Sequence, residues 1–176
     1  AGVTFMRPMR PHEHNMLALA SDKLPDFRVL LAGEGVKEKH VGLFARGRRS
    51  TPLEHEERII FPSYGRSEGI MSDDELWRVP PMRHVEIATA LLARVEADPL
   101  PLVAANFPGP DMLGHLIERH FDACVSTLNS LETVLVGLVR GLHRLGYVVI
   151  LTSDHGNVEN FGPDHGVNPV LTTFVA

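Results

Sequence analysis

Apolar residues recur at helical spacing through the second half of the chain. Between Phe121 and Leu145 an apolar residue returns every three or four positions, which predicts one long amphipathic helix with a single core-facing stripe. The same spacing over residues 82–98 predicts a second helix, ended by the prolines that follow. Continuous apolar runs at 102–105 and 147–151 predict two buried strands. Each run follows one of the two predicted helices.

The first half of the chain is less regular. Its predicted elements are a strand at 3–6, a helix that begins near Asn15, and strands at 40–45 and 58–61 separated by a polar turn. Residues 64–81 show no clear period, and we expect a loop or insertion there.

Helices that alternate with fully apolar strands are typical of a mainly parallel sheet with helices on both faces. The predicted fold class is therefore α/β. The chain begins without Met and ends in an apolar stretch, Val175-Ala176, that resembles a strand. Because domain termini usually lie at the surface, we expect either an internal piece or a shortened relative of a longer protein, with a single partial domain over residues 1–176 and an incomplete sheet.

Composition narrows the class of protein. Of 176 residues, 44% are hydrophobic and 22% charged, which is ordinary for a globular domain and too apolar for a disordered chain. The net charge of -5 argues against a nucleic-acid partner. A single cysteine, Cys124, excludes a disulfide framework and favours a reducing compartment such as the cytoplasm. We also expect no membrane-spanning segment.

Polar residues follow the two predicted strands of the second half. The first strand leads into 106–115, Asn-Phe-Pro-Gly-Pro-Asp-Met-Leu-Gly-His, and the second into 152–157, Thr-Ser-Asp-His-Gly-Asn. In open α/β sheets, binding sites lie just beyond the carboxyl ends of the strands. We therefore expect both segments to face one crevice, with His165 following ten residues after His155.

The spacing of these residues suits metal binding. Asp111 and His115 are four positions apart, so both project from one face of a first helical turn, although such a pair is also common at ordinary helix starts. Asp154 and His155 are adjacent and point in opposite directions, as if toward two metals, and the alternative is a simple Asp-His-Gly-Asn turn. With His165, this mixed carboxylate and imidazole set favours manganese or zinc. Two such metals would serve phosphoryl transfer.

These segments resemble cofactor-independent phosphoglycerate mutase, of the alkaline phosphatase superfamily. Residues 106–115 resemble the family pattern N-F-x-x-P-D-M-V-G-H, and residues 152–157 resemble T-A-D-H-G-N. His165 to Val170 resembles H-T-x-N-P-V. Upstream, residues 5–10 resemble F-x-F-R-P-D-R and residues 40–44 resemble H-V-T-F-F, in the same order as in the family.

The resemblance implies an alkaline-phosphatase-like fold and a specific chemistry. The family interconverts 3-phosphoglycerate and 2-phosphoglycerate in glycolysis through two Mn²⁺ ions and a phosphoserine. The residues that fall on its motifs are Asp111, His115 and His165 for one metal, Asp154 and His155 for the other, Arg7 and Arg10 for the substrate, and Lys39 near a lysine that approaches the phosphoryl group.

The chain also departs from the family pattern. The nucleophilic serine and a further aspartate ligand belong to an N-terminal segment that these residues do not include, so we expect no mutase activity unless the missing half is supplied. The loop before His165 is short, which puts the position of that ligand in question. Two alternatives stay open: a phosphopentomutase-like or phosphatase-like metalloenzyme, and a non-catalytic remnant that binds metal.

Overall fold

A three-stranded parallel sheet forms the centre of the computed structural model, which describes residues 15–63, 82–160 and 164–176. The strand order is β2-β1-β3, with bounds Glu56–Phe61, Val29–Glu34 and Leu102–Ala105. In register, Val29 of β1 lies beside Glu56 of β2 and Leu102 of β3. The predicted parallel sheet is confirmed.

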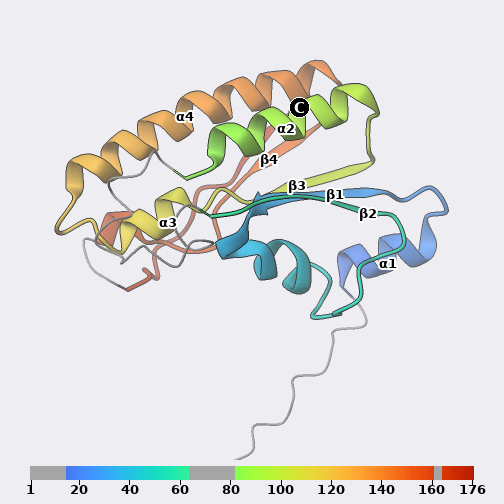
Figure 1. Ribbon diagram of the computed structural model, residues 1–176, viewed down its shortest axis with the longest axis horizontal. Helices are drawn as coiled ribbons and strands as arrows, with labels where there is room; N and C mark the ends of the chain where they lie inside the picture. Colours follow the sequence, from blue (N-terminus) through green and yellow to red (C-terminus); the bar gives the residue numbers. More distant parts are fainter. Residues whose placement is uncertain (1–14, 64–81, 161–163) are drawn as a thin grey trace, which may run out of the picture.

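Helices cover both faces of this sheet (Figure 1). On one face lie α2 (His84–Ala97) and α4 (Phe121–Arg144), and on the other lie α1 (Met16–Lys23) and the short helical turns η1 (Gly35–Lys37) and η2 (His40–Phe44). A short helix, α3 (Gly109–Gly114), follows β3 at its carboxyl end. The α/β class with helices on both faces is thereby confirmed.

Strand β1 is the centre of the core, and all six of its residues are buried. Alternation along the strand divides its side chains between the two faces. Leu30 and Ala32 pack beneath α2 and α4, whereas Val29 and Leu31 join Leu17 of α1 on the other face. One strand thus links two apolar clusters.

A second, smaller sheet lies apart from the first. Strands β4 (Val149–Leu151) and β5 (Thr173–Val175) pair antiparallel, and Ile150 lies beside Phe174. The sequence predicted both strands, but it predicted β4 as buried. That prediction is wrong, because Ile150 is 58% and Leu151 42% exposed.

Two further predictions are corrected. Residues 40–45 were expected to form a strand, but His40–Phe44 form the π-helical turn η2. There Val41 and Ala45, four residues apart, face the same apolar cluster, which suits a helical turn rather than a strand. The single core-facing stripe of α4 is also only half correct, since Leu138 and Leu142 are buried while Phe121 is 50% exposed.

Helix α4 also bears on the expectation that no segment could span a membrane. Within the described residues it is the one helix that is long and apolar enough to do so. Length and composition alone are weak evidence, because core helices share both properties, and α4 packs against α2 and α3.

The expected strand at 3–6 and the loop at 64–81 lie outside the described residues.

Candidate metal centre

Helix α3 places two of the predicted ligands together. Directly after β3, the N–H of Asn106 still donates to Ala32 O of β1 at 3.0 Å, and α3 begins three residues later. Asp111 lies in its first turn and His115 directly follows its last residue. One turn of helix separates them, and His115 Nε2 lies 3.4 Å from Asp111 Oδ1.

His165 reaches the same carboxylate from a distant part of the chain. Its Nε2 lies 3.1 Å from Asp111 Oδ1 and 3.3 Å from His115 Nε2. The three donor atoms therefore form a triangle with edges of 3.1, 3.3 and 3.4 Å. Metal bonds of about 2.0–2.1 Å at tetrahedral angles separate two donors by roughly 3.3–3.4 Å. The three donor atoms are therefore spaced like three ligand atoms of a tetrahedrally coordinated metal ion.

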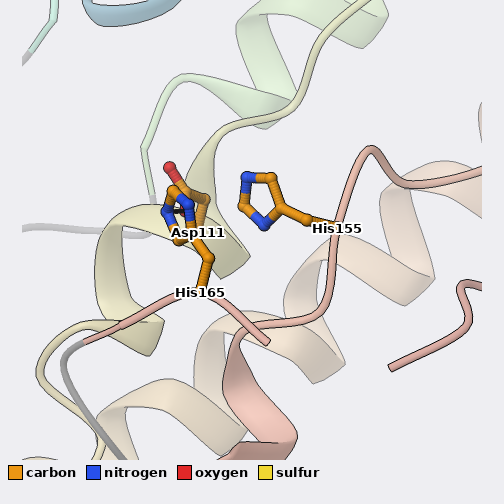
Figure 2. Close-up of side chains that lie close together, drawn as sticks. All are labelled: Asp111, His155 and His165. Carbon is orange, nitrogen blue, oxygen red and sulfur yellow. Dashed lines mark ion pairs between the residues drawn. The ribbon is translucent and has the colours of Figure 1, made fainter. Parts of the chain in front are cut away.

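His155 lies close to Asp111 and His165 (Figure 2). Its ring stacks on the ring of His165, with centroids 3.8 Å apart and planes inclined by 20°. One ligand atom from each of Asp111, His155 and His165 lies within 4.8 Å of the other two. Asp154 is next to the group but 70% exposed, and its Oδ2 lies 3.5 Å from His155 Nε2.

Asn157 fixes the orientation of Asp111. It is 5% exposed, and its Nδ2 donates to Asp111 Oδ1 at 2.7 Å and to the Asp111 carbonyl at 3.1 Å. Gly114 makes room for this amide, since a Cβ there would overlap Asn157 Oδ1. Asn157 Oδ1 itself is buried without a hydrogen-bond partner among the described residues. Asn157 is not among the site residues predicted from the sequence, although it lies only two residues after His155.

Hydrogen bonds between two loops hold His165 in place. Gly166 N donates to Gly156 O at 2.6 Å, so the segment after β4 and the segment around His165 form a bridge. Glu159 adds a second link, because its carboxylate accepts from Asn157 N at 3.1 Å and from Asn168 Nδ2 at 3.3 Å. Backbone N–H donors, including that of Asn157, lower the pKa of Glu159. The short loop therefore still brings His165 to Asp111.

Lys37, rather than Lys39, contacts the cluster. The Lys37 Nζ atom lies 2.6 Å from Asp111 Oδ2, and both side chains are 16% exposed. Burial alone would raise the pKa of Asp111, but the Lys37 ammonium and the Asn157 amide outweigh it, so the net shift is downward. Lys39 lies at the start of η2 and is exposed. Lys39 was predicted from the family resemblance because it directly precedes His40. Its position in the sequence does not show which lysine the helical turn η1 directs toward Asp111.

Of the eight predicted site residues, Asp111, His115, His155 and His165 come together, Asp154 lies at the edge, and Lys39 lies away from them. Arg7 and Arg10 lie outside the described residues. The donor chemistry of this cluster fits a metal ion. A carboxylate and several imidazoles converge, and two ring nitrogens 3.3 Å apart need a proton or a cation between them.

An α/β domain whose strands lead into a cluster of carboxylate and imidazole groups is typical of metalloenzymes. The chain matches the Metalloenzyme superfamily over residues 8–175, and it belongs to that family.

Similar proteins carry a more specific name. The 2,3-bisphosphoglycerate-independent phosphoglycerate mutase of Nitrosococcus oceani is 32% identical over 130 residues, which are 74% of this chain and 23% of the relative. The protein of the same name from Chromohalobacter salexigens is 31% identical over 147 residues, 82% of this chain and 26% of the relative. This chain thus spans about a quarter of the length of these relatives.

The fold also matches a solved structure. A phosphoglycerate mutase of Leishmania mexicana, crystallised at low cobalt concentration, superposes with a TM-score of 0.74 at 22% identity. The match covers 90% of this chain and 30% of that chain. The similarity confirms the α/β architecture expected from the sequence, with a parallel sheet flanked by helices.

Proposed function

We propose that this chain is the metal-binding part of a cofactor-independent phosphoglycerate mutase. The observation that carries the proposal is the triangle formed by Asp111 Oδ1, His115 Nε2 and His165 Nε2, with edges suited to a metal. The similarity to proteins named 2,3-bisphosphoglycerate-independent phosphoglycerate mutase supports the same activity. The substrate would be 3-phosphoglycerate or 2-phosphoglycerate, interconverted in glycolysis in the cytoplasm.

The proposed ligands divide between two Mn²⁺ ions, with Zn²⁺ or another divalent metal as the alternative. Asp111, His115 and His165 would hold one ion, and Asp154 and His155 would contribute to the second. The exposed carboxylate of Asp154 leaves that second set open on one side, which suits a site completed by residues from outside this chain. Bound metals would stabilise the negative charge that develops during phosphoryl transfer.

The chain's own residues would then bind and orient the substrate. Arg7 and Arg10 would hold phosphate or carboxylate oxygens through their guanidinium forks. The Lys37 ammonium, next to Asp111, would lie close to the transferred phosphoryl group. Asn157 would keep Asp111 in one orientation through its two hydrogen bonds. The serine that becomes phosphorylated would come from the missing N-terminal half of the enzyme.

Calorimetry with Mn²⁺ tests the metal site directly. Asp111→Asn keeps the hydrogen-bond acceptor for Asn157 but removes the charge, so we expect Mn²⁺ affinity to fall by more than about 100-fold. Asp22→Asn, at an exposed position of α1, is the matched control and is expected to bind like the parent. Equal affinity of the parent and Asp111→Asn would contradict the assignment.

Turnover separates the possible activities. We expect the purified chain alone to give no conversion of 3-phosphoglycerate, and conversion to appear when the missing half is added. A phosphopentomutase-like or phosphatase-like enzyme would instead act on pentose phosphates or release free phosphate. Metal binding without turnover in the completed protein would identify a non-catalytic remnant.

A further inference from the structure

Two of the proposed metal ligands come from separate segments of the chain, and each is followed by a glycine. Gly156 follows His155, and Gly166 follows His165. Gly166 N donates to Gly156 O, so the two ligands lie on the two sides of a single backbone bridge. Next to this bridge the imidazole rings stack with their centroids 3.8 Å apart. The geometry of the bridge therefore sets how closely His155 and His165 approach each other.

Both glycines make room for a polar side chain. A Cβ on Gly156 would overlap the carboxylate of Glu159, and a Cβ on Gly166 would overlap the amide of Asn160. Glu159 and Asn160 are consecutive residues of one short helical turn, so this turn packs against both sides of the bridge. Neither glycine has a positive φ. Close approach of the two side chains, and not the backbone conformation, is what favours glycine at these positions.

Asn168 joins the two side chains that cover the bridge. Its Nδ2 donates to Glu159 Oε1 at 3.3 Å and to Asn160 Oδ1 at 3.1 Å. Asn168 lies three residues after His165, whereas Glu159 and Asn160 lie in the turn that follows His155. One amide group thus connects the two segments that carry the ligands.

Exposure separates these contacts from the apolar core. Glu159, Asn160 and Asn168 are all exposed residues. Hydrogen bonds between exposed groups contribute little to the stability of a fold, because water competes for the same donors and acceptors. We therefore expect the contacts of Asn168 to affect the relative position of the two segments more than the stability of the domain.

We propose that Asn168 is a positioning residue of the metal centre, which holds His165 against His155 through its bonds to Glu159 and Asn160. The inference rests on the proposed function, in which His165 binds one metal ion and His155 the other. The spacing of the two rings then influences the distance between the ions, which two-metal sites keep at roughly 3.5–4 Å during phosphoryl transfer. Asn168 acts through the two histidines and binds neither metal nor substrate itself.

Reversal of the hydrogen-bond polarity tests this role. Asn168→Asp replaces the donor by a carboxylate, which repels the carboxylate of Glu159 at about pH 8, where both are ionised. Glu159→Gln, added to Asn168→Asp, supplies a donor from the opposite side. The introduced amide can donate to the introduced carboxylate while its oxygen still accepts from Asn157 N. The amide of Asn160 can turn so that its NH₂ group donates to the same carboxylate.

The probe is Co²⁺, added to the purified chain and followed by its visible absorption, which depends on the number and arrangement of its ligands. We expect Asn168→Asp to weaken Co²⁺ binding by roughly 10- to 100-fold and to change the spectrum. Glu159→Gln alone leaves two donors facing each other and is also expected to weaken binding. The double variant is expected to regain the affinity and the spectrum of the parent, which is a non-additive effect.

Two controls separate positioning from general damage to the chain. Thermal unfolding of the metal-free variants is expected to match that of the parent, because the substituted residues are exposed. Asn129→Asp makes the same change at an exposed position of α4 and is expected to bind Co²⁺ like the parent.

Three results would overturn the proposal. Parental affinity and spectrum in Asn168→Asp would show that Asn168 does not position the ligands. Equal losses in Asn168→Asp and in the double variant would show that the bond to Glu159 is not responsible. A parent chain that binds no Co²⁺ would contradict the proposed metal centre itself, and with it this inference.

Discussion

The sheet around β1 and the sheet around β4 differ in how their strands are covered. All six residues of β1 are buried between helices on both faces. In the β4–β5 pair, Ile150 is 58% and Phe174 67% exposed, and Asn157 and Gly156 connect the adjoining loops through hydrogen bonds. Apolar burial stabilises the first region, whereas polar contacts around the candidate metal centre organise the second. The contrast predicts that stability and metal binding respond to different substitutions.

The largest expected effect is in β1. Leu31 is fully buried, so Leu31→Ala is expected to lower the free energy of unfolding by about 2–5 kcal/mol. Ile150→Ala, in β4, removes a largely exposed side chain and is expected to cost less than about 0.5 kcal/mol. Urea unfolding followed by circular dichroism measures both. A cost at Ile150 as large as that at Leu31 would mean that β4 is covered in solution, and the contrast between the regions would disappear.

An intermediate effect is expected where α3 meets Asn157. Gly114→Ala would push the Asn157 amide away from Asp111, at an expected cost of about 1–3 kcal/mol together with weaker Mn²⁺ binding. Gly137→Ala in α4 is the control, because no atom lies within 4 Å of the added Cβ. There the better helix propensity of Ala is expected to stabilise the chain by about 0.5–1 kcal/mol. Unchanged Mn²⁺ affinity in Gly114→Ala would show that Asn157 does not orient the metal ligand.

The sequence predicted the helices of the second half, and several side chains that it proposed as ligands lie together, because both depend on local spacing. A separation of four positions is enough to place Asp111 and His115 on the same side of the α3 turn. His165 also reaches the cluster, but its position depends on the bridge between Gly156 and Gly166, which is a contact between loops. The spacing along the chain could not show that bridge.

The first half was predicted less well for physical reasons. The central strand β1 was missed, although Val29 to Ala32 is a continuous apolar run of the kind that a buried strand requires. The turn η2 was predicted as a strand because so short a segment fits both the helical and the strand period. Packing of Val41 against the core decides between the two. Lys37 was overlooked in favour of Lys39, since the helical turn η1 that directs Lys37 toward Asp111 has no clear sequence signal.

Two carboxylates near the carboxyl ends of β1 and β3 extend the comparison to electrostatics. Glu34, the last residue of β1, is fully buried, and burial raises its pKa although Arg83 N donates to its Oε2 at 3.0 Å. Its Oε1 has no hydrogen-bond partner in the described part of the chain. Asp111, in contrast, has a lowered pKa because the Lys37 ammonium and the Asn157 amide outweigh burial. The surroundings of Glu34 thus disfavour a negative charge, whereas the partners of Asp111 stabilise one.

The smallest expected effect is therefore a dependence on pH at Glu34. Its pKa in the folded chain lies above the ordinary value of 4.5, so the folded state holds the proton more tightly than the unfolded state does. The contribution of Glu34 to stability is complete below about pH 4.5 and is lost as the pH rises through its folded pKa.

Glu34→Gln keeps a neutral acceptor for Arg83 N at every pH. We expect the variant to match the parent near pH 4 and to exceed its free energy of unfolding increasingly as the pH rises to 8. Urea titrations across this range measure the difference, with Glu54→Gln at an exposed position as the control. A difference that stays constant with pH, or that grows toward acid, would show that Glu34 is ionised as readily in the folded chain as in the unfolded one.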